Sequence, residues 1–370
     1  MTTTLLPRLT RVPLLLALAL PGTTSARADE APLKPVYDVP PIHVDAAPIH
    51  YPFGLVSDNK GRVEALLRIG ADGVLNEIVV LESPHPVFES AALDRWLSGS
   101  YRPAYKDGQP IAANLRTGIE FIKPQWVDAF SGVPLRQGTE RDPQGVTPFK
   151  VPERAAPGLP EDYRYDTPPA LTLATGAVYP LGLLQRRVTG SAQVAFVVDA
   201  DGRVRQTRVL EATHPDFGHA AAAMLETWRF KPAKKNGQPS AALLHTTLEF
   251  SRANRDTAPG DEALDLLARL NGEGAPLATT EALDRLPTAR VRPLPVAPRS
   301  GAPAETVWVE FVVDAAGRVQ LPRVVGDATP ARAWAALTAA KRWRFDPPRV
   351  DGQPTPAVLR LPFEFKAATP

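Results

Sequence analysis

The sequence has no cysteine and no apolar run long enough to cross a membrane, and these absences narrow what the protein can do. Without cysteine there is no disulfide, no thiol nucleophile and no attachment point for a lipid. The sequence also contains no glycine-rich phosphate loop and no Gly-x-Ser-x-Gly motif, and its six histidines do not cluster with acidic residues. We therefore expect no enzymatic activity, no cofactor and no bound metal.

The chain also has almost no net charge once residues 1–28 are left out. Residues 1–28 combine Arg8 and Arg11 with the apolar stretch Val12–Leu20 and small residues at Ala26 and Ala28, which is typical of a cleavable signal peptide. That stretch is well below the ~20 residues that span hydrocarbon. Removing residues 1–28 leaves 39 basic and 40 acidic residues, so nothing indicates nucleic-acid binding. We expect a protein that is exported from the cytoplasm and has no membrane span.

One phrase occurs three times in the chain. It reads "GSYRPAYKDGQP" at Gly99–Pro110, "WRFKPAKKNGQP" at Trp228–Pro239 and "WRFDPPRVDGQP" at Trp343–Pro354. A glycine lies 36 residues before the Gln of "GQP" in every copy, and an aromatic residue lies 12 residues after it. This fixed spacing indicates three duplicated folding units.

Each unit shows the same order of predicted elements. A β-rich run with an apolar face of period two comes first, then a short turn at Gly73, Gly202 or Gly317 and a second strand. A helix rich in Ala and Leu follows, the quoted phrase ends it, and a closing strand completes the unit. The apolar face of the first strand comprises Val63, Ala65, Leu67 and Ile69, then Ala192, Val194, Phe196 and Val198, then Val307, Val309, Phe311 and Val313.

These marks resemble the C-terminal domain of TonB, the energy transducer of Gram-negative envelopes. The resemblance rests on Tyr51-Pro52 and Tyr179-Pro180, on "VVDADGRV" at Val197–Val204, on the long match "HPDFGHAAAAMLETWRFKPAKKNGQP" and on "LEF" at Leu248–Phe250. The second copy is nearest to the family pattern. The third has no Tyr-Pro and carries Ala316 where the other copies place Asp before the turn glycine.

The resemblance implies an α+β fold of three tandem small domains, each a three-stranded antiparallel sheet with one or two helices packed on one side. We place the signal peptide at 1–28, repeat 1 at 38–123, a linker at 124–165, repeat 2 at 166–251, a linker with a short helix at 252–284, and repeat 3 at 285–366. The linker helix is expected to begin with Asp261 as N-cap and to present Leu264, Leu267 and Ala268 on one face.

In the family, an extended segment of an outer-membrane transporter pairs with the open edge of the sheet. The closing strand is the expected edge here, and Gly118, Thr247 and Pro362 occupy its equivalent outward positions. Because Pro362 lacks an N–H and Gly118 adds no stiffness, repeat 2 is the favoured site. The candidate residues are Leu244, His245, Thr246, Thr247, Leu248, Glu249 and Phe250, with Tyr179 and Pro180.

Two features depart from the family. No amino-terminal membrane helix with a Pro-rich spacer is present, and the Gln of the family's Gln-Pro-x-Tyr-Pro box is missing before Tyr51 and before Tyr179. A second hypothesis therefore stays open: a structural envelope protein whose domains pack on one another and bury their own edges, with contact to peptidoglycan. Whether the closing strands are covered separates the two hypotheses.

The histidines before two of the helices also have two interpretations. His85-Pro86 and His214-Pro215 recur, which a metal site would need, but the third copy reads Thr329-Pro330 and no carboxylate lies at ligand spacing. A turn that leads into the helix is the favoured interpretation.

Overall fold

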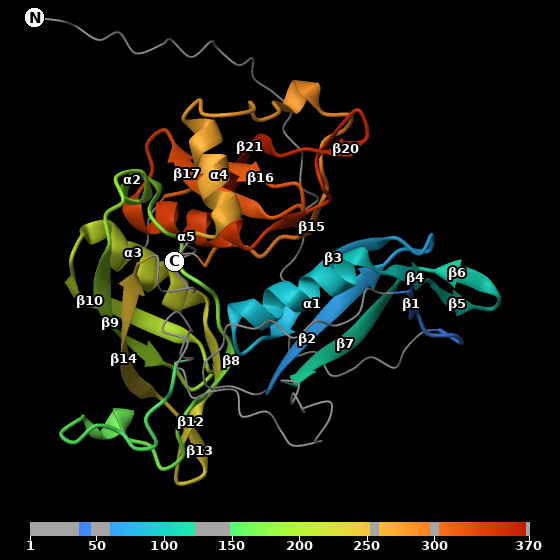
Figure 1. Cartoon of the computed structure of the whole chain (residues 1–370). Helices are drawn as coiled ribbons and strands as arrows, with labels where there is room; N and C mark the ends of the chain where they lie inside the picture. Colours follow the sequence, from blue (N-terminus) through green and yellow to red (C-terminus); the bar gives the residue numbers. More distant parts are fainter. Residues whose placement is uncertain (1–36, 46–59, 123–148, 252–258, 297–302, 368–370) are drawn as a thin grey trace, which may run out of the picture. The chain divides into compact units, whose positions relative to one another are not determined.

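The computed structural model describes residues 37–45, 60–122, 149–251, 259–296 and 303–367 (Figure 1). The predicted signal peptide, together with Tyr51 and Pro52, lies outside the described residues. Residues from Asp38 onward form one compact unit. The domain boundaries given above stay predictions, whereas the elements inside each repeat can be compared directly.

A three-stranded antiparallel sheet forms the centre of each repeat, with the first strand in the middle. The sheet orders are β3-β2-β7, β10-β9-β14 and β17-β16-β21. The expected α+β architecture of small tandem domains is confirmed. The bounds are β2 Lys60–Ile69, β3 Leu75–Glu82 and β7 Ala113–Ile122; β9 Gly190–Val198, β10 Val204–Ala212 and β14 Ala242–Phe250; β16 Glu305–Val313, β17 Val319–Val325 and β21 Ala357–Phe365.

The predicted core face of each middle strand is buried throughout. All twelve residues named for this face are at most 1% exposed. Because side chains alternate between the two faces of a strand, one run of apolar residues at period two is enough to fix which face the helix covers. Large aromatic side chains of the closing strands, Phe121 and Phe250, complete the same cores.

One helix packs on its own sheet in every repeat: α1 (Pro86–Ser98), α3 (Pro215–Thr227) and α5 (Pro330–Lys341) (Figure 1). In the first two, a histidine is the N-cap. The Nδ1 atom of His85 accepts the N–H of Val87, and that of His214 accepts the N–H of Asp216, both at 3.2 Å. The histidines therefore have the helix lead-in role, because capping satisfies amides that the helix itself leaves unpaired.

The repeated phrase forms a strand, a hairpin and a turn. Its first part pairs with a lead-in strand that precedes the sheet, and its second part folds back on itself as a two-stranded ladder. The lead-in pairs are β1 (Ile42–Asp45) with β4 (Ser100–Arg102), β8 (Ala170–Leu173) with β11 (Arg229–Lys231), and β15 (Ala289–Val291) with β18 (Arg344–Phe345). The hairpins are β5 (Ala104–Lys106) with β6 (Gln109–Ile111), β12 (Ala233–Lys235) with β13 (Gln238–Ser240), and β19 (Arg349–Val350) with β20 (Gln353–Pro354).

An aspartate before each lead-in strand holds the hairpin turn. In repeat 2 the turn residues Asn236 and Gly237 both have positive φ, and the carboxylate of Asp166 accepts the N–H of Asn236 at 2.7 Å. Asp38 does the same in repeat 1, and Asp284 in repeat 3. In each unit the turn of the phrase is therefore held by a residue about 70 positions earlier.

The first turn of each unit needs glycine for two reasons. Gly202 has a φ of +75°, and a Cβ added there would overlap the carbonyl group of Phe230. The side chain of Asp199 accepts the N–H groups of Asp201 and Arg203. In repeat 3 the equivalent Asp314 accepts the N–H groups of Ala316 and Arg318 in the same way. The turn is therefore held although Ala316 stands directly before its glycine, because the aspartate that holds it lies two positions before Ala316.

The linker helix α4 (Asp261–Leu270) is present, but its predicted N-cap is wrong and its predicted face is confirmed only in part. Its N-cap is Gly260, and Asp261 is the first helical residue, where a carboxylate favours the helix dipole. Its buried face comprises Ala263, Leu266 and Leu267. This face packs against Leu184 of repeat 2 and Val312 and Leu321 of repeat 3. Leu267 belongs to both the predicted and the buried face, and Leu264 is half-buried against the same cluster, so packing from two repeats buries more of the helix than the sequence predicts.

Repeats also contact one another directly. The cores of repeats 2 and 3 join into one apolar cluster in which α3 packs against α5. The β3 edge of repeat 1 is partly covered: Arg290 of β15 donates to the carbonyl of Leu75 at 2.8 Å, and Val291 enters the core of repeat 1. Beyond the end of β3, Ser83 exchanges backbone hydrogen bonds with the segment around β8.

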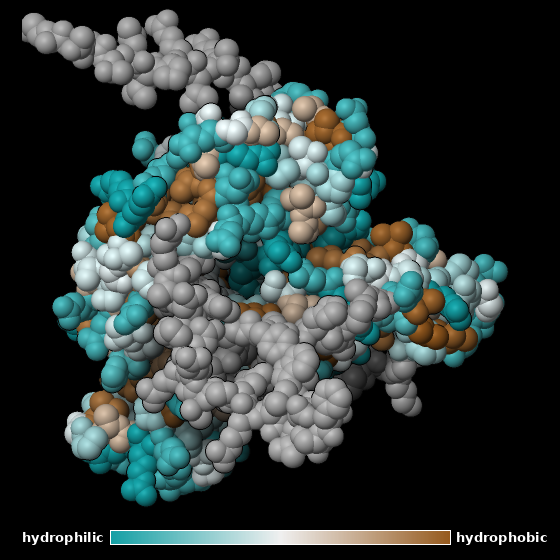
Figure 2. Space-filling view, viewed as in Figure 1, coloured by the Kyte–Doolittle hydropathy of each residue, from teal (hydrophilic) through white to brown (hydrophobic). Residues whose placement is uncertain are grey.

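Polar and weakly apolar residues cover most of the described surface in Figure 2, and strongly apolar residues gather in separate areas. One of these areas lies over β1, where Val39, Ile42 and Val44 are each more than 40% exposed.

Candidate functional site

The closing strand of repeat 2, β14, presents two different faces. Leu244 and Phe250 are buried, and Thr246 and Leu248 on the same face are half-buried. His245, Thr247 and Glu249 are exposed on the opposite face. The candidate residues of this strand therefore divide into four that anchor it to the core and three that face solvent.

The outer edge of β14 carries a row of backbone amides. Ser191 of β9 lies opposite Glu249, but its N–H and C=O bond to Thr213 on the other side of β9. Glu249 and Ser191 are therefore a pair that exchanges no ladder hydrogen bonds. Since such pairs alternate along an antiparallel ladder, the amides of Thr247 and His245 also point away from β9.

A contact in repeat 3 gives independent support that the amide at the position of Thr247 points outward. Val358 of β21 donates its N–H to the carbonyl of Ala278 at 3.0 Å, outside its own sheet. Pro362 lies four residues later, opposite Trp308, so its backbone nitrogen also points away from β16. A proline is tolerated there because no ladder hydrogen bond of its own sheet is lost. Thr247 is the residue of β14 at this position.

The three closing strands differ in what lies along their outer edges. In the described ranges, β14 pairs with β9 and β7 pairs with β2, and neither has a second strand partner. The start of β21, by contrast, is bridged by Ala278. The short helix η1 (Glu161–Tyr163) approaches β14, and the side chain of Lys235 binds the carbonyl of Glu161 at 3.1 Å.

Tyr179 and Pro180 lie beside the strand rather than on its edge. The ring of Tyr179 packs edge-on against Phe217 and against Phe250 of β14, each with ring centroids 5.7 Å apart. Its hydroxyl donates to the carbonyl of Val188 at 2.6 Å, and burial raises the pKa of this phenol. Pro180 is buried and precedes the short helix α2 (Leu181–Gln185). The structure thus brings both residues to the core that supports β14.

Sequence reasoning missed the role of the arginine in the "WRF" phrase. Arg229 donates to the carbonyls of Glu226, Thr227 and Trp228 at the end of α3, a favourable place for a cation. Its counterpart Arg344 donates to the carbonyl of Trp343. The recurrence of "WRF" at the same spacing was the signal that could have pointed to these arginines.

Two segments of the chain, residues 175–251 and 304–367, match the family model described as Gram-negative bacterial TonB protein C-terminal. Repeats 2 and 3 are TonB C-terminal-like domains. The solution NMR structure of the Pseudomonas aeruginosa TonB CTD is similar at 25% sequence identity, covering 22% of this chain and 85% of that chain, with a TM-score of 0.21. No curated protein matches the chain.

All nine candidate residues lie inside the first matched segment. Repeat 1 lies outside both matched segments. It shares with repeats 2 and 3 the residue spacing around the repeated phrase and the order of strands in its sheet. Among the helices that the structure describes, none has the length and apolar character needed to cross a membrane.

Proposed function

We propose that this protein is exported to the periplasm and binds an extended segment of an outer-membrane transporter, or of another envelope protein, along β14. The observation that carries the proposal is the row of outward amides on β14, which has no strand partner in the described part of the chain. An added strand binds such an edge through main-chain hydrogen bonds. The TonB C-terminal match of this repeat agrees with that mode of binding. The proposal includes no catalytic step and no cofactor.

Repeat 2 is the preferred site because the other two edges are less suitable. Pro362 removes one outward N–H from β21, and Ala278 already bonds to Val358 at the start of that strand. Gly118 occupies the same position in β7, where it contributes no side chain to contact a partner. On β14 the polar side chains of His245, Thr247 and Glu249 stand beside the amides.

Main-chain bonds alone give limited affinity. Each contributes about 0.5–1.5 kcal/mol net, so three bonds supply only a few kcal/mol. We therefore expect the partner's side chains to add contacts with the exposed face of β14, and a segment with a polar side chain opposite Thr247 suits that face.

Amide chemical shifts in solution test the proposal directly. A synthetic peptide from a periplasm-facing segment of an outer-membrane transporter is added to the chain without residues 1–28, and a peptide of the same composition in scrambled order is the control. We expect the shifts to concentrate on residues 243–250. Shifts elsewhere, or equal shifts with the scrambled peptide, would contradict strand addition at β14.

A structural role is the second candidate, and one observation favours it. The cores of repeats 2 and 3 join, and segments of both cover parts of the β3 edge of repeat 1. If packing is the whole function, the transporter peptide leaves the amide shifts of residues 243–250 unchanged.

A further inference from the structure

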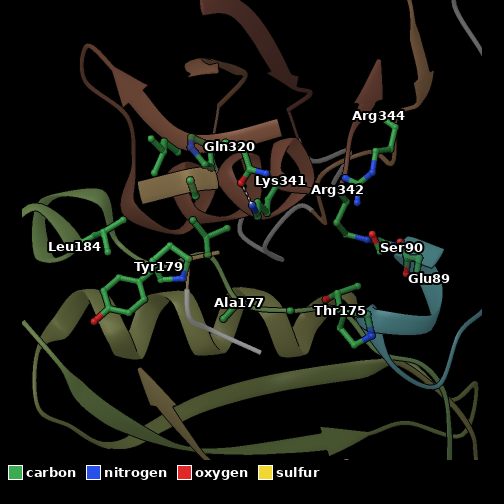
Figure 3. A pocket seen from close by; sticks show the side chains of 17 residues that line it. Glu89, Ser90, Thr175, Ala177, Tyr179, Leu184, Gln320, Lys341, Arg342 and Arg344 are labelled. Carbon is green, nitrogen blue, oxygen red and sulfur yellow. Dashed lines mark hydrogen bonds and ion pairs between the residues drawn. The ribbon is translucent and has the colours of Figure 1, made fainter. Parts of the chain in front are cut away.

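A cavity of about 230 Å³ lies where the three repeats meet (Figure 3). Its lining comes from the start of α1, from the segment after β8 together with α2, from the start of α4, from β17 and from the end of α5 with β18. One wall is cationic and carries Lys341, Arg342 and Arg344. The other is mostly apolar and includes Ala177, Leu184 and Leu321.

Cations outnumber carboxylates among the residues that line this cavity. Among the lining residues, Glu89 is the one carboxylate beside three cations, and its Oε1 lies 3.3 Å from the guanidinium of Arg342. Figure 3 shows Arg342 extending toward Glu89 and Ser90. The ammonium of Lys341 donates to neutral acceptors, the carbonyl of Val319 at 3.2 Å and Oε1 of Gln320 at 2.8 Å.

Nearby carboxylates are already engaged. Asp94 pairs with Arg318 at 2.7 Å, and Asp314 accepts the amides of its turn and the side-chain N–H of Gln320. Arg344 forms one hydrogen bond, to the carbonyl of Trp343, and no ion pair with a described residue. The carboxylates of Glu89, Asp94 and Asp314 act on its charge through space, without an ion pair.

Several buried polar atoms at the cavity lack hydrogen-bond partners. They include Nε of Arg342, Nε of Arg344 and Oε2 of Glu89. Taking a guanidinium out of water is costly unless an anion compensates it. Burial also lowers the pKa of Lys341 to about 8 and lowers the pKa of Arg344, in each case chiefly by desolvation of the charged form.

We propose that this cavity binds a small organic or inorganic anion, with a carboxylate or phosphate head group against Arg342, Arg344 and Lys341. A guanidinium fork matches the oxygens of either head group. The apolar wall at Ala177, Leu184 and Leu321 leaves room for a short apolar body. The volume is somewhat below the roughly 300–1,000 Å³ of pockets for drug-sized ligands, so the ligand is small.

This site is separate from the edge of β14 and does not depend on the proposed function. Because its walls come from three repeats, an anion bound there contacts all three at once. A ligand that binds only the folded arrangement stabilises it in proportion to its concentration over its dissociation constant.

Isothermal titration calorimetry with the chain lacking residues 1–28 tests the site. Inorganic phosphate and hexanoate are the two probes, each at constant ionic strength against chloride, and they distinguish a bare head group from one with an apolar body. We expect saturable binding of at least one probe, and a rise of several degrees in the melting temperature at saturation.

Arg344→Met is the decisive variant, and Arg360→Met is its control, since Arg360 lies over the ring of Trp308 and outside the cavity lining. We expect Arg344→Met to lower affinity at least tenfold while its melting temperature without the anion is equal to wild type or higher, because the variant removes a buried charge that forms no ion pair. Arg342→Gln gives a second measurement of affinity. Absence of saturable binding, or equal affinity in Arg344→Met and wild type, would overturn the proposal.

Discussion

A proline at Thr247 should separate partner binding from folding. The amide of Thr247 points to the outer side of β14, so Thr247→Pro removes one donor from the edge and none from the pairing with β9. Pro362 occupies the equivalent place in β21, so we expect the free energy of unfolding to fall by less than about 1 kcal/mol. A bound strand loses one hydrogen bond, about 0.5–1.5 kcal/mol, and leaves its own carbonyl poorly paired, at about 1–3 kcal/mol.

The combined loss of about 2 kcal/mol or more corresponds to an affinity about 30-fold lower. Calorimetric titration of the transporter peptide measures that affinity, and urea unfolding measures stability. Thr247→Val is the matched control, because it changes the side chain and keeps the N–H. The reasoning is refuted if Thr247→Pro binds as tightly as wild type, or if Thr247→Val loses as much affinity as Thr247→Pro.

Two further predictions concern stability. Gly202→Ala should lower the free energy of unfolding by about 3 kcal/mol, because it combines a left-handed φ with overlap against the carbonyl of Phe230. Gly237→Ala is the control: its φ is also positive but its surroundings are open, so it should cost about 1 kcal/mol. Equal losses of the two variants in urea unfolding would argue against the overlap. Lys341 has its pKa lowered from 10.5 to about 8 in the folded chain, so the unfolded chain binds more protons between these values, and stability should rise with pH across them. Relative to Lys341→Met, wild type should gain about 1–2 kcal/mol between pH 7.5 and 9.5, and parallel pH profiles would contradict the shift.

The sequence was sufficient for the core of each repeat because that information is local. A period of two places Val194 and Phe196 on one face whatever the neighbouring repeats do, and the fixed spacing around "GQP" orders the elements. The turn at Ala316 shows the limit of this reasoning. The other two copies place Asp directly before the turn glycine, whereas the side chain that holds this turn in repeat 3 is Asp314, three positions before Gly317.

The sequence was enough to rank the three closing strands as binding edges, but not to show in which direction their amides point. Pro362 and Thr247 align by spacing alone, which selected repeat 2. The direction of the amides depends on how Ser191 bonds to Thr213 across β9, and this is a property of the folded sheet. The cavity with Arg344 was out of reach for a similar reason, because its walls come from three repeats whose packing no single repeat encodes.

Duplication of a small sheet multiplies exposed edges, and this chain handles them differently in each repeat. The β3 edge of repeat 1 is partly covered by β15, and the start of β21 is bridged by Ala278 from the segment after α4. Both covering segments precede the central strand of repeat 3, and they cover edges that would otherwise attract other strands. The described linker residues add no strand to β14, although η1 approaches it. Since β7 and β14 each pair with one strand among the described residues, the preference between them rests on the aligned outward position, where Thr247 offers a side chain to a partner and Gly118 offers none.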